Sequence, residues 1–164
     1  MKKAALHNLG CKVNAYETEA MQHLLEEAGY EIVPFTQKAD VYVINTCSVT
    51  NMADRKSRQM LHKAKKNNPD SIVVAAGCYV QTSEKEVLND LSVDIVIGND
   101  RKHDLVRLLE EYSLDSVNDT VDDINDGKHD FEELFIDQTK EHTRAFIKVQ
   151  DGCCLLYTSD AADE

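Results

Sequence analysis

The stretch from Val41 to Thr50, VYVINTCSVT, decides how the rest of the chain is interpreted. It begins with apolar, β-branched or aromatic residues and ends in polar residues around Cys47. A helical pattern, MADRKSRQMLHKAKKN, follows at residues 52–67. An apolar run that is bounded by polar turn residues and followed by a helix is typical of a buried parallel strand. Cys47 is then expected at the carboxyl end of that strand, where open α/β sheets bind ligands.

Two more cysteines follow predicted strands in the same way. Cys11 ends HNLGC after a strand at residues 3–8, and Cys78 ends VVAAGC after a strand at residues 71–76. The separations, 36 residues from Cys11 to Cys47 and 31 from Cys47 to Cys78, match one strand-plus-helix unit and no short zinc motif. We therefore expect three thiols at one edge of a sheet.

Strand and helix patterns alternate through the first 112 residues. Asn14 is the expected N-cap of the first helix, and Ser83 with Glu86 has the spacing of a capping box. The alternation predicts an α/β fold, with a doubly wound, mostly parallel sheet, flanking helices and right-handed crossovers. Besides the elements already given, helices are expected at residues 14–28, after Ser83 and at 101–112, and strands at 30–34 and 93–97.

The composition is that of a globular chain without a membrane span. Of 164 residues, 42% are hydrophobic and 29% charged, and the net charge is −12. Most of this charge lies in residues 113–140 and 154–164, so the remainder is nearly neutral. No apolar run reaches the roughly 18 residues of a membrane span, and no signal peptide pattern is present, so a cytoplasmic protein is expected. In that compartment spaced cysteines indicate metal binding or catalysis more often than disulfides.

The sequence changes character after residue 112. Residues 113–140 are acidic and weakly patterned, which predicts a linker, with a candidate hairpin at Asp126-Gly127. Residues 143–150, TRAFIKVQ, alternate between apolar and polar and predict a strand that leads to Cys153. The last residues, CLLYTSDAADE at 154–164, continue neither pattern. We expect this tail to be foreign, as a cloning scar, a frame error or a sequencing-derived end would be.

Three soft thiolates at one edge suit zinc or an iron–sulfur cluster. A cluster that is held by three thiolates leaves one iron open to an outside ligand. Packing is the competing explanation, because cysteine is among the most buried residue types. Gly10 and Gly77, directly before two of the cysteines, suit a tight turn or a close approach to a ligand. The spacing alone leaves open a cluster site, a structural zinc site and a flavodoxin-like binding module whose cysteines are packing.

The helix after Cys47 is basic. Arg55, Lys56 and Arg58 lie in its early turns, nearer to Cys47 than the later lysines do. Such a helix is either a solvated surface or a phosphate-contacting patch beside the cysteines. The phosphate-binding motifs GxGxxG and GxxxxGKS and the serine nucleophile motifs are absent, and the six histidines have no paired spacing.

The segments around the three cysteines resemble the methylthiotransferase family of radical S-adenosylmethionine enzymes. LGCKVNAYETE, INTCSVTNMADRKSRQ and AAGCYVQ are similar, in order, to the three cysteine segments of that family's N-terminal domain. FIKVQDGC is similar to the entry to its radical domain, so the resemblance covers residues 3–153. LGCKVN, YETE and ADRKSRQ most resemble the members that act on threonylcarbamoyladenosine in tRNA.

The resemblance implies a role for each cysteine segment. Cys11, Cys47 and Cys78 would ligate an auxiliary 4Fe–4S cluster through three irons, and the fourth iron would carry the sulfur species that is delivered. The radical domain would hold a second 4Fe–4S cluster and cleave S-adenosyl-L-methionine, and a second S-adenosyl-L-methionine would supply the methyl group. The product would be the 2-methylthio derivative of N6-threonylcarbamoyladenosine next to the anticodon. The implied partner is the tRNA anticodon stem-loop, with no membrane and no DNA, and a C-terminal RNA-binding domain would complete the enzyme.

The chain departs from the family pattern after Cys153. The radical cluster requires CxxxCxxC counted from Cys153, and Tyr157 and Asp160 stand at the next two positions. Cys153 is therefore left out of the candidate site, and Cys154 does not fit the spacing. We expect a cluster-binding domain at residues 1–112, an acidic linker at 113–140, the start of a truncated radical domain at 141–153 and a foreign tail at 154–164. We also expect that this chain does not catalyse the reaction alone.

Overall fold

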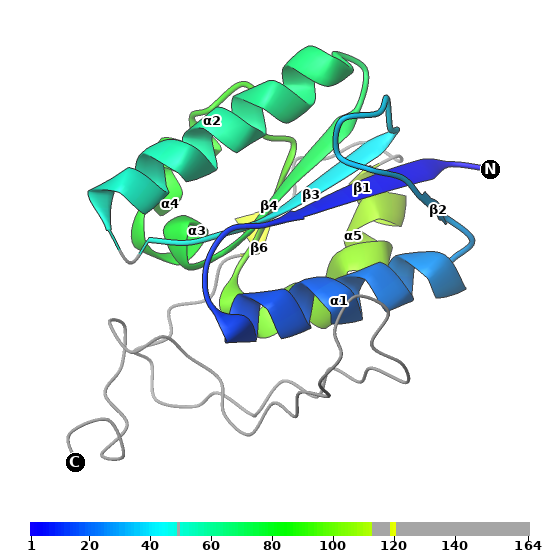
Figure 1. The fold of residues 1–164 in the computed structure, drawn as a ribbon, viewed down its shortest axis with the longest axis horizontal. Coiled ribbons are helices and arrows are strands. Elements are labelled where there is room, and N and C mark those ends of the chain that lie inside the picture. The colour runs from blue at the N-terminus through cyan, green and yellow to red at the C-terminus, as the bar shows by residue number, and fades with distance from the viewer. Residues whose placement is uncertain (49, 113–118, 121–164) are drawn as a thin grey trace.

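In the computed structural model of the protein, the described residues are 1–48, 50–112 and 119–120. Within them one sheet has the strand order β2-β1-β3-β4-β5-β6, and each pair of neighbouring strands is parallel (Figure 1). The strands are β1 (Lys3–Asn8), β2 (Glu31–Ile32), β3 (Val41–Thr46), β4 (Ile72–Gly77), β5 (Ile95–Ile97) and β6 (Asp119–Thr120). The helices are α1 (Lys12–Glu27), α2 (Asn51–Asn67), α3 (Cys78–Thr82), α4 (Glu84–Leu88), the 3₁₀ helix η1 (Asn99–Asp104) and α5 (Leu105–Tyr112).

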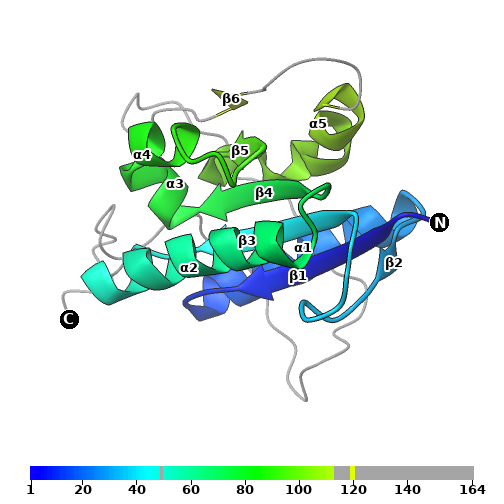
Figure 2. The same ribbon diagram turned by 90° about the horizontal axis from the view of Figure 1, so that it is seen from above.

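Helices cover both faces of the sheet, as the predicted doubly wound α/β fold requires. Helices α1 and α5 lie on one face, and α2, α3 and α4 lie on the other (Figures 1 and 2). On the first face, Met21 of α1 and Leu105 of α5 belong to one apolar core. On the second, Leu61 of α2 and Tyr79 of α3 belong to another. Because β3 is buried along its whole length between these cores, its sequence is a continuous apolar run.

The first helix begins earlier than its pattern predicts. Cys11 is the N-cap residue of α1 and makes no side-chain cap bond, so the predicted cap at Asn14 is wrong. Asn14 lies inside the helix, and its side-chain amide donates to the carbonyl oxygens of Leu9 (3.1 Å) and Thr46 (3.0 Å). Because Asn14 already lies three residues beyond the N-cap, its side chain instead joins the start of α1 to the carbonyls at the end of β3 and just beyond the end of β1.

The predicted capping box at Ser83 is also wrong. Ser83 is the N-cap residue of α4, but its side chain makes no cap bond. The Glu86 carboxylate accepts instead from the Tyr79 hydroxyl at 3.3 Å and lies 3.8 Å from the guanidinium of Arg58. Glu86 therefore connects α4 to α3 and α2 rather than to the start of its own helix.

The sheet takes its last strand from the acidic segment. Asp119 and Thr120 pair with Val96 and Ile97 of β5, although the sequence predicts a linker there. The rest of residues 113–140, the candidate hairpin, the strand at 143–150, the second-domain start at 141–153 and the tail at 154–164 lie outside the described residues. Within the described part of the chain, none of the helices has the length and hydropathy to cross a membrane.

Candidate functional site: three thiols at one edge of the sheet

The three predicted site cysteines follow three neighbouring parallel strands. Cys47 comes directly after β3, Cys78 directly after β4, and Cys11 three residues after β1. The register places the ends of these strands side by side, because Asn8 is paired with Asn45 and Thr46 with Gly77. We call this the thiol edge: the carboxyl ends of β1, β3 and β4 with the three cysteines. It includes the point between β1 and β3 where the strand order reverses, a common ligand site in open α/β sheets.

The cysteines differ in exposure. All three are free cysteines; Cys11 is exposed, whereas Cys47 and Cys78 are buried. The Cys11 thiol lies 3.8 Å from Oδ1 of Asn14, a distance at which a thiol is a weak donor. The backbone N–H of Cys47 donates to Oγ of Ser57 at 3.4 Å, and the Ser57 hydroxyl donates to the Cys47 carbonyl at 3.2 Å. Helix α2 thus holds the Cys47 segment in place.

Two glycines allow the backbone to approach closely at this edge. Gly10 has a φ of +135°, and a Cβ at that position would lie 3.0 Å from Cβ and 3.1 Å from Sγ of Cys47. Its missing side chain lets the turn before Cys11 pack against Cys47. Gly77 has a φ of +97°, and a Cβ there would lie 2.5 Å from Oδ1 of Asn45 and 2.5 Å from the carbonyl oxygen of Thr46.

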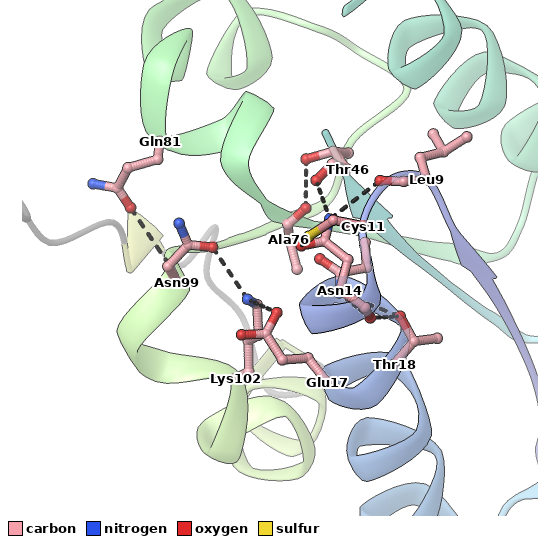
Figure 3. A network of polar contacts seen from close by, with 11 residues as sticks. Leu9, Cys11, Asn14, Glu17, Thr18, Thr46, Ala76, Gln81, Asn99 and Lys102 are labelled. Atoms are coloured by element: carbon pink, nitrogen blue, oxygen red, sulfur yellow. Dashed lines mark hydrogen bonds and ion pairs between the residues drawn. The ribbon is translucent and has the colours of Figure 1, made fainter. Parts of the chain in front are cut away.

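Two asparagines connect the Cys11 segment to the Cys47 segment. The Asn14 amide bridges the carbonyls of Leu9 and Thr46, which Figure 3 shows from close by. The Asn45 amide donates to the carbonyl of Asn14 at 3.0 Å and to Oγ1 of Thr18 at 3.2 Å. Oδ1 of Asn45 is buried and has no hydrogen-bond partner among the described residues, which is uncommon for a buried polar atom. The sequence pattern indicated Asn14 only as a cap and gave no role to Asn45.

A second series of polar contacts connects α1 to η1 and η1 to α3 (Figure 3). Nζ of Lys102 lies 2.5 Å from Oε2 of Glu17 and donates to Oδ1 of Asn99 at 3.1 Å. The backbone N–H of Asn99 donates to Oε1 of Gln81 at 3.4 Å. Lys102 is 1% exposed and Glu17 4%. No sequence signal predicts this pair, because residues that are 85 positions apart leave no local pattern.

Helix α2 starts beside Cys47 and carries cations on its exposed side. Four of them form no ion pair within the described residues: Arg55, Lys56, Lys63 and Lys66. Of the other cations, Arg58 pairs loosely with Glu86, and Lys65 lies 2.8 Å from Oδ2 of Asp94. Three basic residues were predicted to lie near Cys47. Among the described residues Arg58 has an ion-pair partner, whereas Arg55 and Lys56 have none.

The positive charge of α2 also acts on β1. Burial lowers the pKa of His7 below its ordinary value, and the nearby charges of Lys56 and Lys63 lower it further. Both lysines are thus close enough to His7 to disfavour a further positive charge there.

The three cysteines at the thiol edge are of the ligand type that iron–sulfur clusters bind. Three thiolates are soft ligands of the type that such clusters and zinc prefer. Within residues 1–48, 50–112 and 119–120, however, no group of three or more His, Cys, Asp or Glu side chains stands in an arrangement that could hold a metal ion. The three thiols are therefore candidate ligands by residue type and by their common position at one edge of the sheet.

The sequence that builds this edge is shared with a family of known proteins. Residues 3–98, more than half of the chain, match the model described as uncharacterized protein family UPF0004. The chain belongs to the UPF0004 family. All three candidate cysteines lie within the matched residues, whereas Lys102 lies just beyond them. The family membership that the cysteine segments predict is confirmed.

Several curated relatives of this UPF0004 chain are named as enzymes that modify tRNA. It is 44% identical over 155 residues to threonylcarbamoyladenosine tRNA methylthiotransferase MtaB of Bacillus subtilis, an alignment that covers 93% of this chain and 34% of the relative. The protein of the same name from Aquifex aeolicus is 41% identical over 153 residues, with 92% and 37% covered. The tRNA-2-methylthio-N(6)-dimethylallyladenosine synthase of Ehrlichia canis is 31% identical over 157 residues, with 93% and 36% covered. The chain spans about a third of the length of the curated relatives it matches.

Proposed function

We propose that this chain is the auxiliary-cluster domain of a radical S-adenosylmethionine tRNA methylthiotransferase, in which Cys11, Cys47 and Cys78 ligate a 4Fe–4S cluster. The observation that carries the proposal is the placement of one cysteine after each of three neighbouring parallel strands. The names of the relatives support the reaction class, since they are called tRNA methylthiotransferases and, in one case, a 2-methylthio-adenosine synthase.

The residues at the thiol edge have separate tasks in this proposal. Cys47 and Cys78 are buried thiols that would hold the protein side of the cluster away from water. Cys11, on an exposed turn next to Gly10, is the ligand that would close the site when the cluster binds. When bound, the cluster would supply an iron without a protein ligand, which is where the sulfur destined for substrate would attach.

We assign the substrate from the relatives. The Bacillus and Aquifex proteins are named for threonylcarbamoyladenosine in tRNA, so N6-threonylcarbamoyladenosine beside the anticodon is the proposed target. A radical domain with a second 4Fe–4S cluster and S-adenosyl-L-methionine would complete the enzyme, in the cytoplasm. Because Tyr157 and Asp160 stand where that domain's second and third cysteines are expected after Cys153, this chain should not catalyse the reaction alone.

We propose the exposed side of α2 as a contact for the tRNA backbone. Four of its cations form no ion pair with another described residue, and the helix begins beside Cys47, so bound RNA would lie next to the thiol edge. The overall acidity of the chain does not oppose this, since most of its net negative charge lies in residues 113–140 and 154–164.

Anaerobic reconstitution with ferrous iron and sulfide tests the cluster proposal. The parent chain should take up about four irons with matching acid-labile sulfide. The triple variant Cys11→Ala, Cys47→Ala, Cys78→Ala should take up almost none. The matched control is the double variant Cys153→Ala, Cys154→Ala, which removes two thiols that the proposal does not use and should bind as much iron as the parent.

The alternatives give different results in the same experiment. A structural zinc site would yield about one zinc per chain that survives air and is lost with the three cysteines. A flavodoxin-like binding module with packed cysteines would bind equally little metal in the parent and in the triple variant, while both remain folded. Either result would contradict the cluster assignment.

A further inference from the structure

We propose that the buried pair of Lys102 and Glu17 is a positioning device that fixes the Cys78 segment relative to the Cys11 segment at the thiol edge. The inference rests on the proposed cluster function, and it adds residues that are not themselves ligands. Its effect would be on the arrangement of the thiols and therefore on the cluster they hold.

The contacts form a continuous path between two of the thiols. Cys11 is the N-cap of α1, and Glu17 lies in the same helix. Glu17 binds Lys102, which binds Asn99. Asn99 in turn binds Gln81 of α3, the helix whose first residue is Cys78. Figure 3 shows the side chains of Glu17, Lys102, Asn99 and Gln81 in sequence along this path.

The path complements the link to the third thiol. Asn14 and Asn45 already hold the Cys11 segment against the Cys47 segment. The path through Lys102 connects the Cys78 segment to the same helix, α1. Helix α1 thereby becomes the common reference for all three cysteines, through Asn14 toward Cys47 and through Glu17 toward Cys78.

The buried ion pair between Lys102 and Glu17 is not expected to add much to the free energy of unfolding. Both side chains are almost completely removed from water, and the desolvation of two charges offsets much of their attraction. Well-packed apolar residues of similar size often stabilise a protein as much or more. What apolar residues do not provide is direction. Nζ of Lys102 donates across to Glu17 of α1 and, within its own helix η1, to Asn99, so the ammonium group holds η1 in a defined orientation against α1.

Replacement of the pair by apolar residues separates positioning from stability. The double variant Glu17→Leu, Lys102→Met should unfold at the same urea concentration as the parent chain or at a higher one. After anaerobic reconstitution with iron and sulfide, however, it should lose iron in air several-fold faster and show altered g-values in the electron paramagnetic resonance spectrum of the reduced cluster. The matched control, Glu27→Leu with Lys38→Met, changes the same residue types at exposed positions and should match the parent in every measurement.

A second variant keeps the ion pair and breaks only its continuation. Asn99→Ala removes the acceptor on η1 and leaves Glu17 and Lys102 paired. It should therefore reproduce part of the spectral change and of the faster iron loss even if the double variant fails to fold. Iron content, spectrum and air sensitivity all equal to those of the parent in Asn99→Ala and in a folded double variant would overturn the inference while leaving the cluster assignment intact. A parent chain that binds no iron would overturn both.

Discussion

Gly77 meets two demands that no other residue type meets together. Its φ of +97° is one that L side chains rarely adopt, and a Cβ would lie 2.5 Å from the backbone carbonyl oxygen of Thr46. Backbone atoms inside a central strand pair do not move easily, so Gly77→Ala should lower the free energy of unfolding by about 2–4 kcal/mol. Urea denaturation measures this loss.

Gly29 provides the control for that prediction. Its φ is +84°, but an added Cβ would meet no neighbouring atom of the described residues within 4 Å. Only the unfavourable backbone conformation therefore opposes Gly29→Ala. Its cost should be about 1 kcal/mol. Equal losses in the two variants would show that the contact with the Asn45–Thr46 segment is not what requires glycine at position 77.

His7 makes stability depend on pH. Burial first, and then the charges of Lys56 and Lys63, lower its pKa in the folded chain, whereas the unfolded chain has the ordinary value near 6.5. Below that value the unfolded chain binds the proton more readily, so the stability present above about pH 6.5 falls as the pH drops through the folded-state pKa. His7→Gln should weaken this dependence in unfolding measurements between about pH 8 and 5. An unchanged slope would show that His7 is not responsible.

At the scale of elements, α2 carries the RNA-contact prediction. In a full-length version of the enzyme, charge reversal of Lys56 and Lys63 should weaken tRNA binding and reduce its salt dependence by about one phosphate contact per lysine. The measurement is a binding isotherm at several salt concentrations. Lys38→Glu, an exposed charge reversal outside α2, serves as the control. An affinity and a salt slope equal to those of the parent would exclude α2 as a tRNA contact.

The elements also show what sequence patterns detect. Strand β3 was predictable because its two-sided burial demands a continuous apolar run. Helix α3 was not, since the five residues of CYVQT are too short for a helical period to show. The predicted helix at 101–112 begins instead with η1, where Arg101 has a non-helical φ of −128°. The cysteines were predictable from their places after strands, whereas Lys102 and Glu17 come together only through the tertiary fold.

At the scale of the whole molecule, the sheet brings together at one edge cysteines that are far apart in the sequence. Cys11, Cys47 and Cys78 come from three separate strand-helix units, and the path through Lys102 reaches the fourth unit after β5. Parallel strand order is what makes this convergence possible, since every carboxyl end then points the same way. In the proposed arrangement, helix α1 is the element to which the segments of all three cysteines are connected.

The two apolar cores set the limits of the folding unit. Their buried members run from Ala4 to Leu109, and β6 at Asp119–Thr120 covers the edge of β5. A fragment of residues 1–120 should therefore unfold cooperatively, at a temperature within a few degrees of the parent, and should take up the same amount of iron. A fragment of residues 1–112 should melt at a lower temperature, because it leaves β5 as an unprotected edge strand. Circular dichroism with temperature and iron analysis after reconstitution measure both. If the 1–120 fragment lost its cooperative transition, residues beyond Thr120 would belong to the folding unit that holds the three thiols.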